Sequence, residues 1–469
     1  MVRDRLLAAL AGVALALGAC GGEPEVIEVA VPELPRPHHV LIVLVDTLRA
    51  DHMAVYGYPR DTTPFLDAFL EQGVRFDRAA SQSSWTAPSV ISMFTGRDVA
   101  GESLAMPADL PAMAELFQQA GYRTGAFVLN PLIQNRENDF HRGFDTFKTS
   151  KVMREVSKWI WNSQGQDTLT YVHLVTTHDP YAIDPQFHHF TGGPPLVPEA
   201  IEERWQAAAE GGLELSTDVR EHMEQQRNRY DDDVRLMDSQ FGTIVNYLEV
   251  TGQLEDAVVI LCSDHGEGLW TRPAFTFSPE ARGPATVEQR FKMTHGGQVY
   301  EELTRVPLLV WAPGVARGRV VDEQVGNVDL LPTLLELADL PLPEGELSGR
   351  SLAPLLYADA PDLSDGAEAV RPVGTTMSAT RYLHALWSGP YKLIRPTALG
   401  RGEGLETELY DLVADPDESH DLAAERPGLV AELEAELEAR LAGSILDADA
   451  ELDMTQTNLE AMRALGYTD

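Results

Sequence analysis

The chain has 469 residues, enough for one large domain or two ordinary domains with buried cores. Its composition, 44% hydrophobic and 23% charged, is typical of a globular protein. The formal net charge of −37 argues against a nucleic-acid-binding protein, because such a protein needs a basic face.

The N-terminal residues predict an export signal followed by a lipid anchor. Two arginines precede an apolar run over residues 6–17, which is too short to cross a bilayer that requires about 20 apolar residues. The run ends in Leu-Gly-Ala-Cys20, which resembles a bacterial lipobox; the alternative is a plain signal peptide with a chance cysteine. We expect a lipoprotein signal peptide at 1–19, a lipid on Cys20 and a Pro- and Glu-rich tether at 20–37. The mature protein would then be an exported bacterial lipoprotein, anchored to a membrane in the periplasm or at the cell surface.

Apolar runs and helical patterns alternate over the next 300 residues or so. Continuous apolar runs predict strands buried on both faces of a parallel sheet, at 40–45, 124–129, 169–175, 257–261 and 306–311. Helical patterns lie between them, at 63–72, 110–121 and 229–251. This alternation predicts a doubly wound α/β domain, which we place at residues 38–347.

The pattern changes beyond about residue 348. Shorter strands are predicted at 382–388 and 391–395, followed by an amphipathic helix at 427–442 with leucines at every fourth position. We expect a smaller α+β subdomain at 348–443 and a tail at 444–469 without a strong period.

Polar residues follow four of the predicted strands. Asp46 follows the first, Asn130 the second, His178 lies just after the third, and Asp264 and His265 come after the fourth. In open α/β sheets the carboxyl ends of the strands meet at one edge, where functional groups collect. These residues are therefore predicted to share one site.

The residue types in this set suit a metal-dependent reaction. Two carboxylates and an imidazole bind divalent cations, and the hydroxyl of Thr86 would complete four ligands. A metal would also lower the pKa of that hydroxyl and make it a nucleophile. His178 and His295 are candidates for the acid or for a hydrogen-bond donor to a developing anion. Each residue also has a simpler interpretation, such as Asp46 as a helix N-cap, so the prediction rests on their joint occurrence.

A series of motifs surrounds these residues. They are Val45-Asp46-Thr47-Leu48-Arg49, Ser84-Trp85-Thr86-Ala87-Pro88-Ser89, Phe94-Thr95-Gly96-Arg97, His178-Asp179-Pro180-Tyr181, Ser263-Asp264-His265-Gly266-Glu267 and Tyr300-Glu301-Glu302. In this order, from about His39 to about Ala442, the sequence resembles the sulfatase family of the alkaline-phosphatase superfamily.

The resemblance implies an α/β, alkaline-phosphatase-like main domain, with a mostly parallel central sheet flanked by helices, and a small C-terminal α+β subdomain. It also implies a divalent metal and a covalent intermediate on the enzyme. Carried over by position, the implied metal ligands are Asp46, Thr86, Asp264 and His265. Thr86 occupies the nucleophile position, and His178 matches a histidine that contacts the substrate or leaving group. Asn130 and His295 fall where family members place polar contacts to the substrate.

Several positions depart from the family pattern. Thr86 stands where typical sulfatases have a cysteine that is oxidised to formylglycine, and Val90 stands at an arginine that orients the modified residue. Thr47 replaces a second metal-binding aspartate, and Gly296 stands near a usual sulfate-contacting lysine. Leu174 lies where two-metal phosphatases have an aspartate, which favours one metal over two.

We therefore predict a metal-dependent hydrolase of sulfuric or of phosphoric or phosphonic esters that acts through Thr86 with one Ca, Mn, Mg or Zn ion. A threonine sulfate ester lacks the geminal hydroxyl by which formylglycine expels sulfate, and this favours a phosphorus ester. The substrate would be an ester of glycan or lipid origin, with the membrane as the second partner and no nucleic acid. The alternatives are a phospholipid head-group transferase and an inactive metal-binding surface protein.

Overall fold

The computed structural model describes residues 36–101, 103–181, 189–191, 217–269, 295–357, 375–380, 382–402, 404–445 and 456–464. The predicted signal peptide, Cys20 and most of the tether lie outside these residues, so the lipid anchor stays a prediction. Within the described residues, no helix is both long enough and apolar enough to span a membrane.

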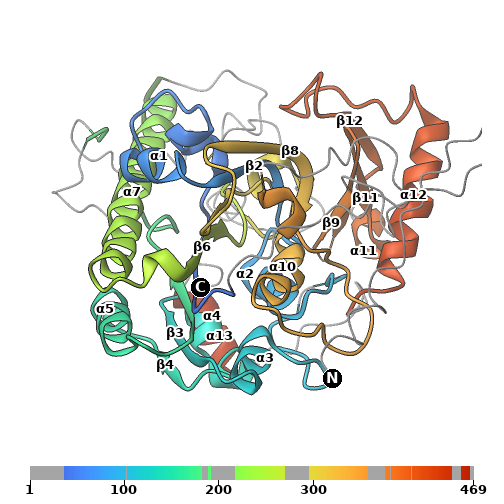
Figure 1. The fold of residues 1–469 in the computed structure, drawn as a ribbon. Helices are drawn as coiled ribbons and strands as arrows, with labels where there is room; N and C mark the ends of the chain where they lie inside the picture. Colours follow the sequence, from blue (N-terminus) through green and yellow to red (C-terminus); the bar gives the residue numbers. More distant parts are fainter. Residues whose placement is uncertain are drawn as a thin grey trace, which may run out of the picture.

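An eight-stranded sheet forms the centre of the molecule, in the order β4-β3-β5-β1-β6-β7-β2-β8 (Figure 1). Strand β7 is antiparallel to both of its neighbours and every other neighbouring pair is parallel, which confirms the predicted mostly parallel sheet. The strands are β1 (His39–Val45), β2 (Val74–Ala80), β3 (Arg123–Val128), β4 (Thr146–Lys148), β5 (Thr168–Leu174), β6 (Ala257–Ser263), β7 (Leu308–Trp311) and β8 (Arg319–Gly326).

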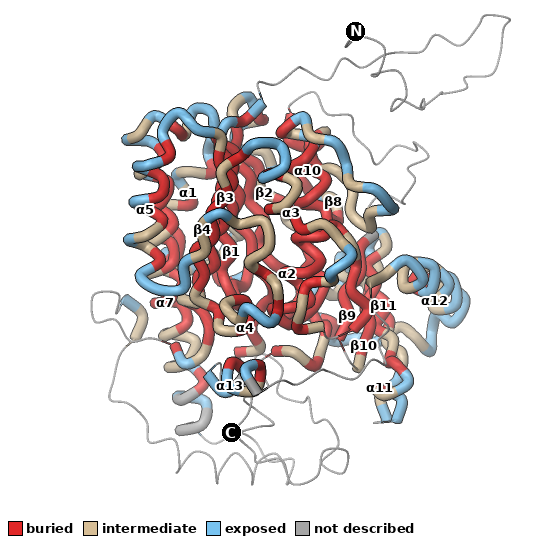
Figure 2. Tube along the Cα trace, turned by 90° about the horizontal axis from the view of Figure 1, so that it is seen from below, coloured by how far each residue is buried: buried red, intermediate tan, exposed pale blue. Residues whose placement is uncertain are grey.

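Helices cover both faces of this sheet, which explains why its central strands are continuous apolar runs. Every residue of β1, β5 and β6 is buried, and buried residues concentrate on the strands and on the inward sides of the helices (Figure 2). One face packs against α2 (Thr86–Thr95), α3 (Met113–Gln119) and α10 (Leu330–Leu337). The other face packs against α1 (Pro64–Leu70), α5 (Val152–Asn162) and α7 (Thr217–Val250).

A second, antiparallel sheet follows, which confirms the predicted small C-terminal subdomain. Its four strands are ordered β12-β11-β10-β9 and lie beside the large sheet together with α12 (Figure 1). Two of the predicted leucines, Leu433 and Leu437, are buried against this sheet. The elements are β9 (Thr375–Ala379), β10 (Leu383–Ser388), β11 (Tyr391–Pro396), α11 (Ala398–Gly402), β12 (Glu408–Asp411) and α12 (Pro427–Leu441).

Three strands of the large sheet, β2, β4 and β8, carry no continuous apolar run and were not predicted. Strand β2 reads VRFDRAA, and its charged residues are only partly buried. The tail also differs from expectation, because it contains α13 (Gln456–Ala464), which packs against α4 (Pro131–Gln134). Asn458 Oδ1 of α13 accepts hydrogen bonds from the side chains of Asn135 and Asn138, at 2.8 and 3.0 Å. One further short helix, α9 (Glu301–Thr304), precedes β7.

Candidate active site

Three adjacent strands end at the same level and bring the residues that follow them together. Val45 of β1 lies opposite Ser263 of β6 and opposite Leu174 of β5. Asp46 and Asp264 are therefore the first residues beyond two neighbouring strand ends, and both are fully buried. The structure thus brings together the strand-end residues that the sequence placed at one edge.

Thr86, the first residue of α2, also lies at this edge of the sheet. Its Oγ1 lies 3.2 Å from His265 Nε2. Ser89, one turn further along, donates a hydrogen bond of 2.9 Å to the carbonyl of Ser83 and fixes the turn before the helix. The partial positive charge at the helix N-terminus favours an anion beside Thr86.

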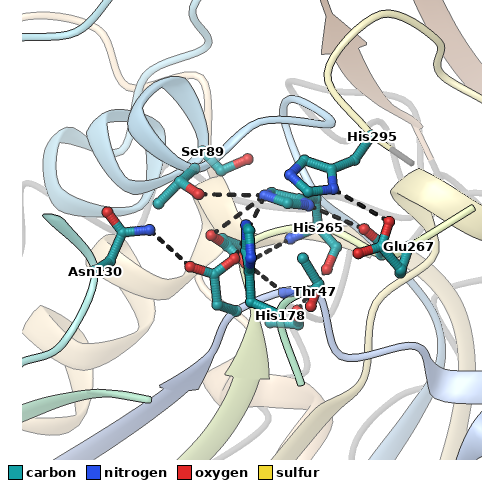
Figure 3. A network of polar contacts seen from close by, with 12 residues as sticks. Thr47, Ser89, Asn130, His178, His265, Glu267 and His295 are labelled. Atoms are coloured by element: carbon teal, nitrogen blue, oxygen red, sulfur yellow. Dashed lines mark hydrogen bonds and ion pairs between the residues drawn. The ribbon is translucent and has the colours of Figure 1, made fainter. Parts of the chain in front are cut away.

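His265, His178, His295 and Glu267 lie close together in the site (Figure 3). His265 Nε2 lies 3.7 Å from Asp46 Oδ1 and 3.5 Å from Asp264 Oδ2. Both carboxylate oxygens are buried and have no hydrogen-bond partner among the residues that the structure describes. Ligand distances of about 2.0–2.6 Å place the ligand atoms of one cation about 3–4 Å apart, so these separations fit a metal site.

The protonation of His265 supports the same conclusion. Its Nδ1 lies 2.9 Å from the carbonyl oxygen of Gly266, which can only accept, so Nδ1 carries the proton. Burial lowers the pKa of His265 and keeps the ring neutral. The lone pair of Nε2 therefore faces two carboxylates, an arrangement that is repulsive without a cation between them.

The two aspartates differ in their electrostatic surroundings. Burial alone would raise the pKa of Asp46, but His178 and His173 hold it well below the usual range. Burial and the charge of Asp46 raise the pKa of Asp264. Two carboxylates this close do not both ionise readily unless positive charge is added, and a divalent cation would supply it.

His173 is a member of the site that the sequence analysis missed. Its Nε2 lies 3.4 Å from Asp46 Oδ2, and Asp46, His173 and Asp264 form a buried group that could hold a metal ion. Its Nδ1 lies 3.1 Å from the hydroxyl of Tyr171, two residues earlier on the same side of β5. A histidine near the end of an otherwise apolar strand was the available signal, but it was interpreted as part of the buried run.

Asn130 lies deeper than a substrate contact would require. It is fully buried, its Oδ1 accepts from the backbone amides of Leu132 and Ile133, and its Nδ2 donates to Asp46 Oδ2 at 2.7 Å. In this structure Asn130 orients Asp46 and caps α4. The predicted contact with substrate stays a prediction.

Thr47 is not one of the residues whose side chains could bind the cation. Its backbone is left-handed, with φ of 58°, and its Oγ1 donates to the carbonyl of Thr177 at 2.7 Å. Its amide lies 3.3 Å from Asp264 Oδ1. Thr47 thus ties together the turns after β1, β5 and β6, where many sulfatases have a second aspartate.

His178 and His295 lie together at the same site and are each 5% exposed. Their rings are in edge contact with centroids 5.1 Å apart, and the His295 ring lies 4.5 Å from that of His265. Burial would lower the pKa of His178, but the carboxylates of Asp46 and Glu267 raise it above the usual histidine value. A protonated His178 is suited to the role of general acid.

Glu267 is a second residue of the site to which the sequence analysis gave no role. It is fully buried, and its Oε1 lies 3.2 Å from His295 Nδ1 (Figure 3). It fixes the orientation of His295 and adds negative charge near His178. Its place at the end of the Ser263–Glu267 motif was the signal that could have identified it.

Comparisons with known proteins identify the family. The sulfatase family profile matches residues 38–340, and a profile for the C-terminal part of N-sulphoglucosamine sulphohydrolase matches residues 295–445. The ulvan-active sulfatase of Formosa agariphila is 23% identical over 87% of this chain and 82% of its own length. Human arylsulfatase A is 26% identical over 88% of this chain and 89% of its own length. Arylsulfatase K of Xenopus laevis is 31% identical, but the match spans only 43% of this chain and 34% of that protein.

Two solved structures share the fold at 19% identity. The phosphonate monoester hydrolase of Agrobacterium radiobacter gives a TM-score of 0.66, covering 87% of this chain and 96% of the other. A protein solved with its substrate D-glucosamine-2-N,6-O-disulfate gives a TM-score of 0.67, covering 89% of this chain and 100% of the other. The family profile spans well over half of the sequence, and the chain therefore belongs to the sulfatase family of ester hydrolases.

Proposed function

We propose that this protein is a divalent-metal-dependent hydrolase of phosphoric, phosphonic or sulfuric esters that uses the Thr86 hydroxyl as its nucleophile. The observation that carries the proposal is the convergence of Thr86 Oγ1, His265 Nε2 and the unpartnered oxygens of Asp46 and Asp264. Family membership supplies the general reaction, which is ester hydrolysis.

Asp46, Asp264, His265 and Thr86 would hold one cation, with His173 beside Asp46. Oxygen ligands with one imidazole suit Ca, Mn, Mg or Zn. When bound, the cation supplies positive charge that lowers the pKa of a hydroxyl and stabilises the anionic transition state.

The protein's own residues account for each proton in a two-step reaction. In the first step, Thr86 Oγ bonds to the phosphorus or sulfur, its proton passes to Asp264, and the bond to the alcohol oxygen breaks. His178 gives its proton to that alcohol. In the second step, water attacks the phosphorus or sulfur and gives a proton to His178, while Thr86 leaves and recovers its proton from Asp264.

The identity of the nucleophile favours a phosphorus ester. A threonine ester has no geminal hydroxyl, so it is released only by attack of water at the phosphorus or sulfur. Phosphorus accepts such an attack in known covalent phosphoenzymes, such as the aspartyl-phosphate of ATPases. We therefore rank phosphoric and phosphonic esters ahead of sulfuric esters, with a glycan or lipid as the alcohol portion.

We also propose that the protein is exported and held on a bacterial membrane by a lipid on Cys20. The lipobox-like sequence supports this proposal. Mass spectrometry of the membrane fraction should find the N-terminal peptide beginning at a diacylated Cys20, and Cys20→Ser should release the protein. An unmodified Cys20 would contradict the proposal.

The nucleophile is tested with a matched series of nitrophenyl esters. We would measure hydrolysis of the sulfate, phosphate monoester, phosphodiester and phosphonate in the presence of Ca, Mn, Mg or Zn. Thr86→Ala should abolish turnover of the phosphorus esters. Thr86→Ser should keep a measurable rate and trap a phosphorylated serine under rapid acid quench.

The control is Thr95→Ala, because Thr95 lies on the same helix and its hydroxyl donates to the carbonyl of Ile91, one turn earlier. This variant should retain activity. Turnover that survives Thr86→Ala would show that the nucleophile lies elsewhere, and turnover confined to the sulfate would reverse the order of substrates.

A further inference from the structure

A cavity of about 280 Å³ lies between the large sheet and the small sheet. The large sheet contributes residues of β2 and β8, and the small sheet contributes Trp387 of β10 and the chain that follows β12. Figure 1 shows the small sheet beside this part of the large one. Binding pockets occur preferentially where two structural units meet. None of the active-site residues described above lines this joint cavity, so it is a separate place in the molecule.

Three polar residues lining the joint cavity come from one face of the large sheet. Arg78 of β2 pairs with Gln324 of β8 in parallel register, and Asp322 lies two residues before Gln324. Paired residues of neighbouring strands lie on the same face of a sheet, and so do residues two apart on one strand. Ala80, two residues after Arg78, packs in one apolar cluster with Trp387. This face is therefore the one turned toward the small sheet.

The polar groups of the joint cavity keep hydrogen-bonding capacity that the protein does not use. Arg78 and Arg305 each donate to one backbone carbonyl, at 2.6 and 3.2 Å, and neither forms an ion pair within the described residues. Gln324 is only 4% exposed, and the one side-chain hydrogen bond it makes in the described part of the chain is a long contact of 3.4 Å to the next carbonyl. Since a guanidinium has five N–H donors and an amide also has an acceptor oxygen, both kinds of group are left for a ligand.

The charges around the joint cavity nearly cancel. Two of the lining carboxylates already have partners, because Asp77 lies 2.6 Å from an arginine of the same strand and Glu301 lies 3.0 Å from Lys392. Glu418 shares that lysine, at 2.8 Å, and Asp322 is a further acidic residue of the lining. These last two carboxylates offset the two unpaired arginines. A cavity without a dominant charge favours an uncharged ligand over an ion of either sign.

The remaining half of the lining is apolar. Leu412, Val413 and Pro416, which follow β12, contribute to it together with Trp387. Val413 is 75% exposed, more than any other exposed large hydrophobic residue in the described part of the chain. An exposed apolar side chain beside a cavity offers a surface on which a ligand can bury its C–H groups.

A sugar ring combines the properties that this lining requires. Each of its hydroxyls both donates and accepts a hydrogen bond, the ring carries no charge, and its C–H groups can cover an apolar wall. The volume of about 280 Å³ is at the lower end of the roughly 300–1,000 Å³ of pockets for drug-sized ligands, so it suits one ring better than a longer chain.

We propose that the joint cavity binds one neutral sugar residue. Arg78, Arg305, Asp322 and Gln324 bond to its hydroxyls, and Val413 covers its C–H groups. The site takes no part in bond breaking, and the inference does not depend on the proposed function.

Direct binding of small glycosides tests this inference. The methyl glycosides of glucose, galactose, xylose and N-acetylglucosamine would be titrated by saturation-transfer NMR. At least one should bind with a Kd on the order of 1–10 mM, as a single small ring does when it makes a few hydrogen bonds. Arg78→Ala/Asp322→Ala removes donors and an acceptor without changing the net charge, and it should weaken binding tenfold or more.

A second variant keeps the test decisive if the double variant does not fold. Val413→Asp alters an exposed side chain and should weaken binding about threefold or more, because the apolar wall is lost. Val250→Asp is its matched control, since Val250 is 63% exposed on α7 and does not line the joint cavity, and it should change nothing. All three variants should hydrolyse nitrophenyl esters at the rate of the natural protein.

Three results would overturn the inference. One is the absence of binding by all four glycosides, and another is binding that persists unchanged in both cavity variants, which would place the sugar elsewhere. The third is a tenfold preference for methyl glucuronide over methyl glucoside, which would make the cavity an anion site. Because binding is measured without turnover, these results are independent of whether Thr86 is a nucleophile.

Discussion

Charged side chains are buried at two places in the molecule. One is the candidate active site at the carboxyl ends of β1, β5 and β6, called here the catalytic edge, and the other is the joint between the two sheets. The two places differ in how the buried charges are paired. At the joint, Lys392 is fully buried, and its Nζ lies 3.0 Å from Glu301 Oε1 and 2.8 Å from Glu418 Oε1. The same ammonium lies 4.5 Å from the centre of the Trp387 ring, whose Nε1 donates to Glu301 at 2.8 Å. One ammonium thus lies in ion-pair contact with both carboxylates of this joint cluster.

At the catalytic edge the balance is missing. Asp46 and Asp264 face each other across neutral His265, and each keeps an oxygen without a hydrogen-bond partner. A buried charge that is fully paired within the protein holds elements together, whereas buried carboxylates that converge without a cation leave a place for one. The joint cluster is therefore expected to contribute to stability, and the catalytic edge to binding and chemistry.

Asp264→Asn is expected to give the largest effect, a loss of activity and metal binding without a loss of stability. The variant keeps the shape of the side chain but removes a negative charge that the proposed cation would need. We expect ester turnover to fall on the order of 10³-fold and metal affinity to fall with it. The metal-free protein should be as stable as the unchanged protein or more stable, by urea unfolding, because repulsion with Asp46 is relieved. A large loss of metal-free stability would show that the edge is structural.

Lys392→Met is expected to do the opposite, which is to lower stability without changing metal affinity. Glu301 and Glu418 would stay buried without their cation, and breaking such a pair costs about 3–5 kcal/mol of unfolding free energy. Urea unfolding measures this loss, and Lys158→Met on the exposed part of α5 is the matched control. The folded fraction should keep its metal affinity, and a selective loss of metal binding would contradict the assignment.

His173→Gln sharpens the definition of the catalytic edge. Removing a histidine beside a metal-binding carboxylate typically weakens the metal 10–100-fold. Tyr171→Phe, which removes only the hydroxyl near His173 Nδ1, should have a smaller effect in the same direction. Calorimetric titration with Mn or Zn measures both. Unchanged affinity in His173→Gln would place His173 outside the metal site.

The smallest expected effect is on how the free energy of unfolding depends on pH. Glu301 at the joint and Asp264 at the catalytic edge should change it in opposite directions. Burial would raise the pKa of Glu301, but Lys392 lowers it on balance, so its contribution to stability is present above the ordinary carboxyl pKa and is lost as pH falls through the lowered value. Burial and Asp46 raise the pKa of Asp264, so its contribution is present at low pH and is lost as pH rises through the raised value.

This difference can be measured by urea unfolding of the metal-free protein from about pH 3 to about pH 8. Glu301→Gln should reduce the stability that is lost as the pH falls. Asp264→Asn should reduce the stability that is lost as the pH rises. Identical pH profiles in the two variants would contradict the comparison.

The sequence by itself determined the central strands and the edge at which the site forms. Apolar runs such as β1 have a single stable place, between two layers of helices, and the residue after each run is then fixed at the sheet edge. Asp46, His178, Asp264 and His265 could be placed at this edge for this reason, and the family resemblance gave Thr86 the nucleophile position.

The tertiary structure alone decided which side chains meet over long sequence distances. Strand β2 is partly charged and becomes a strand only because β7 and β8 pair with both of its edges. His173 looks like one more buried residue until β1 places Asp46 beside it, and Asn130 turns inward because that carboxylate accepts its hydrogen bond. The local sequence pattern predicts how far a segment is buried. It does not predict contacts between residues more than 80 positions apart, such as Asn130 and Asp46, because these depend on packing and on the pairing of buried charges.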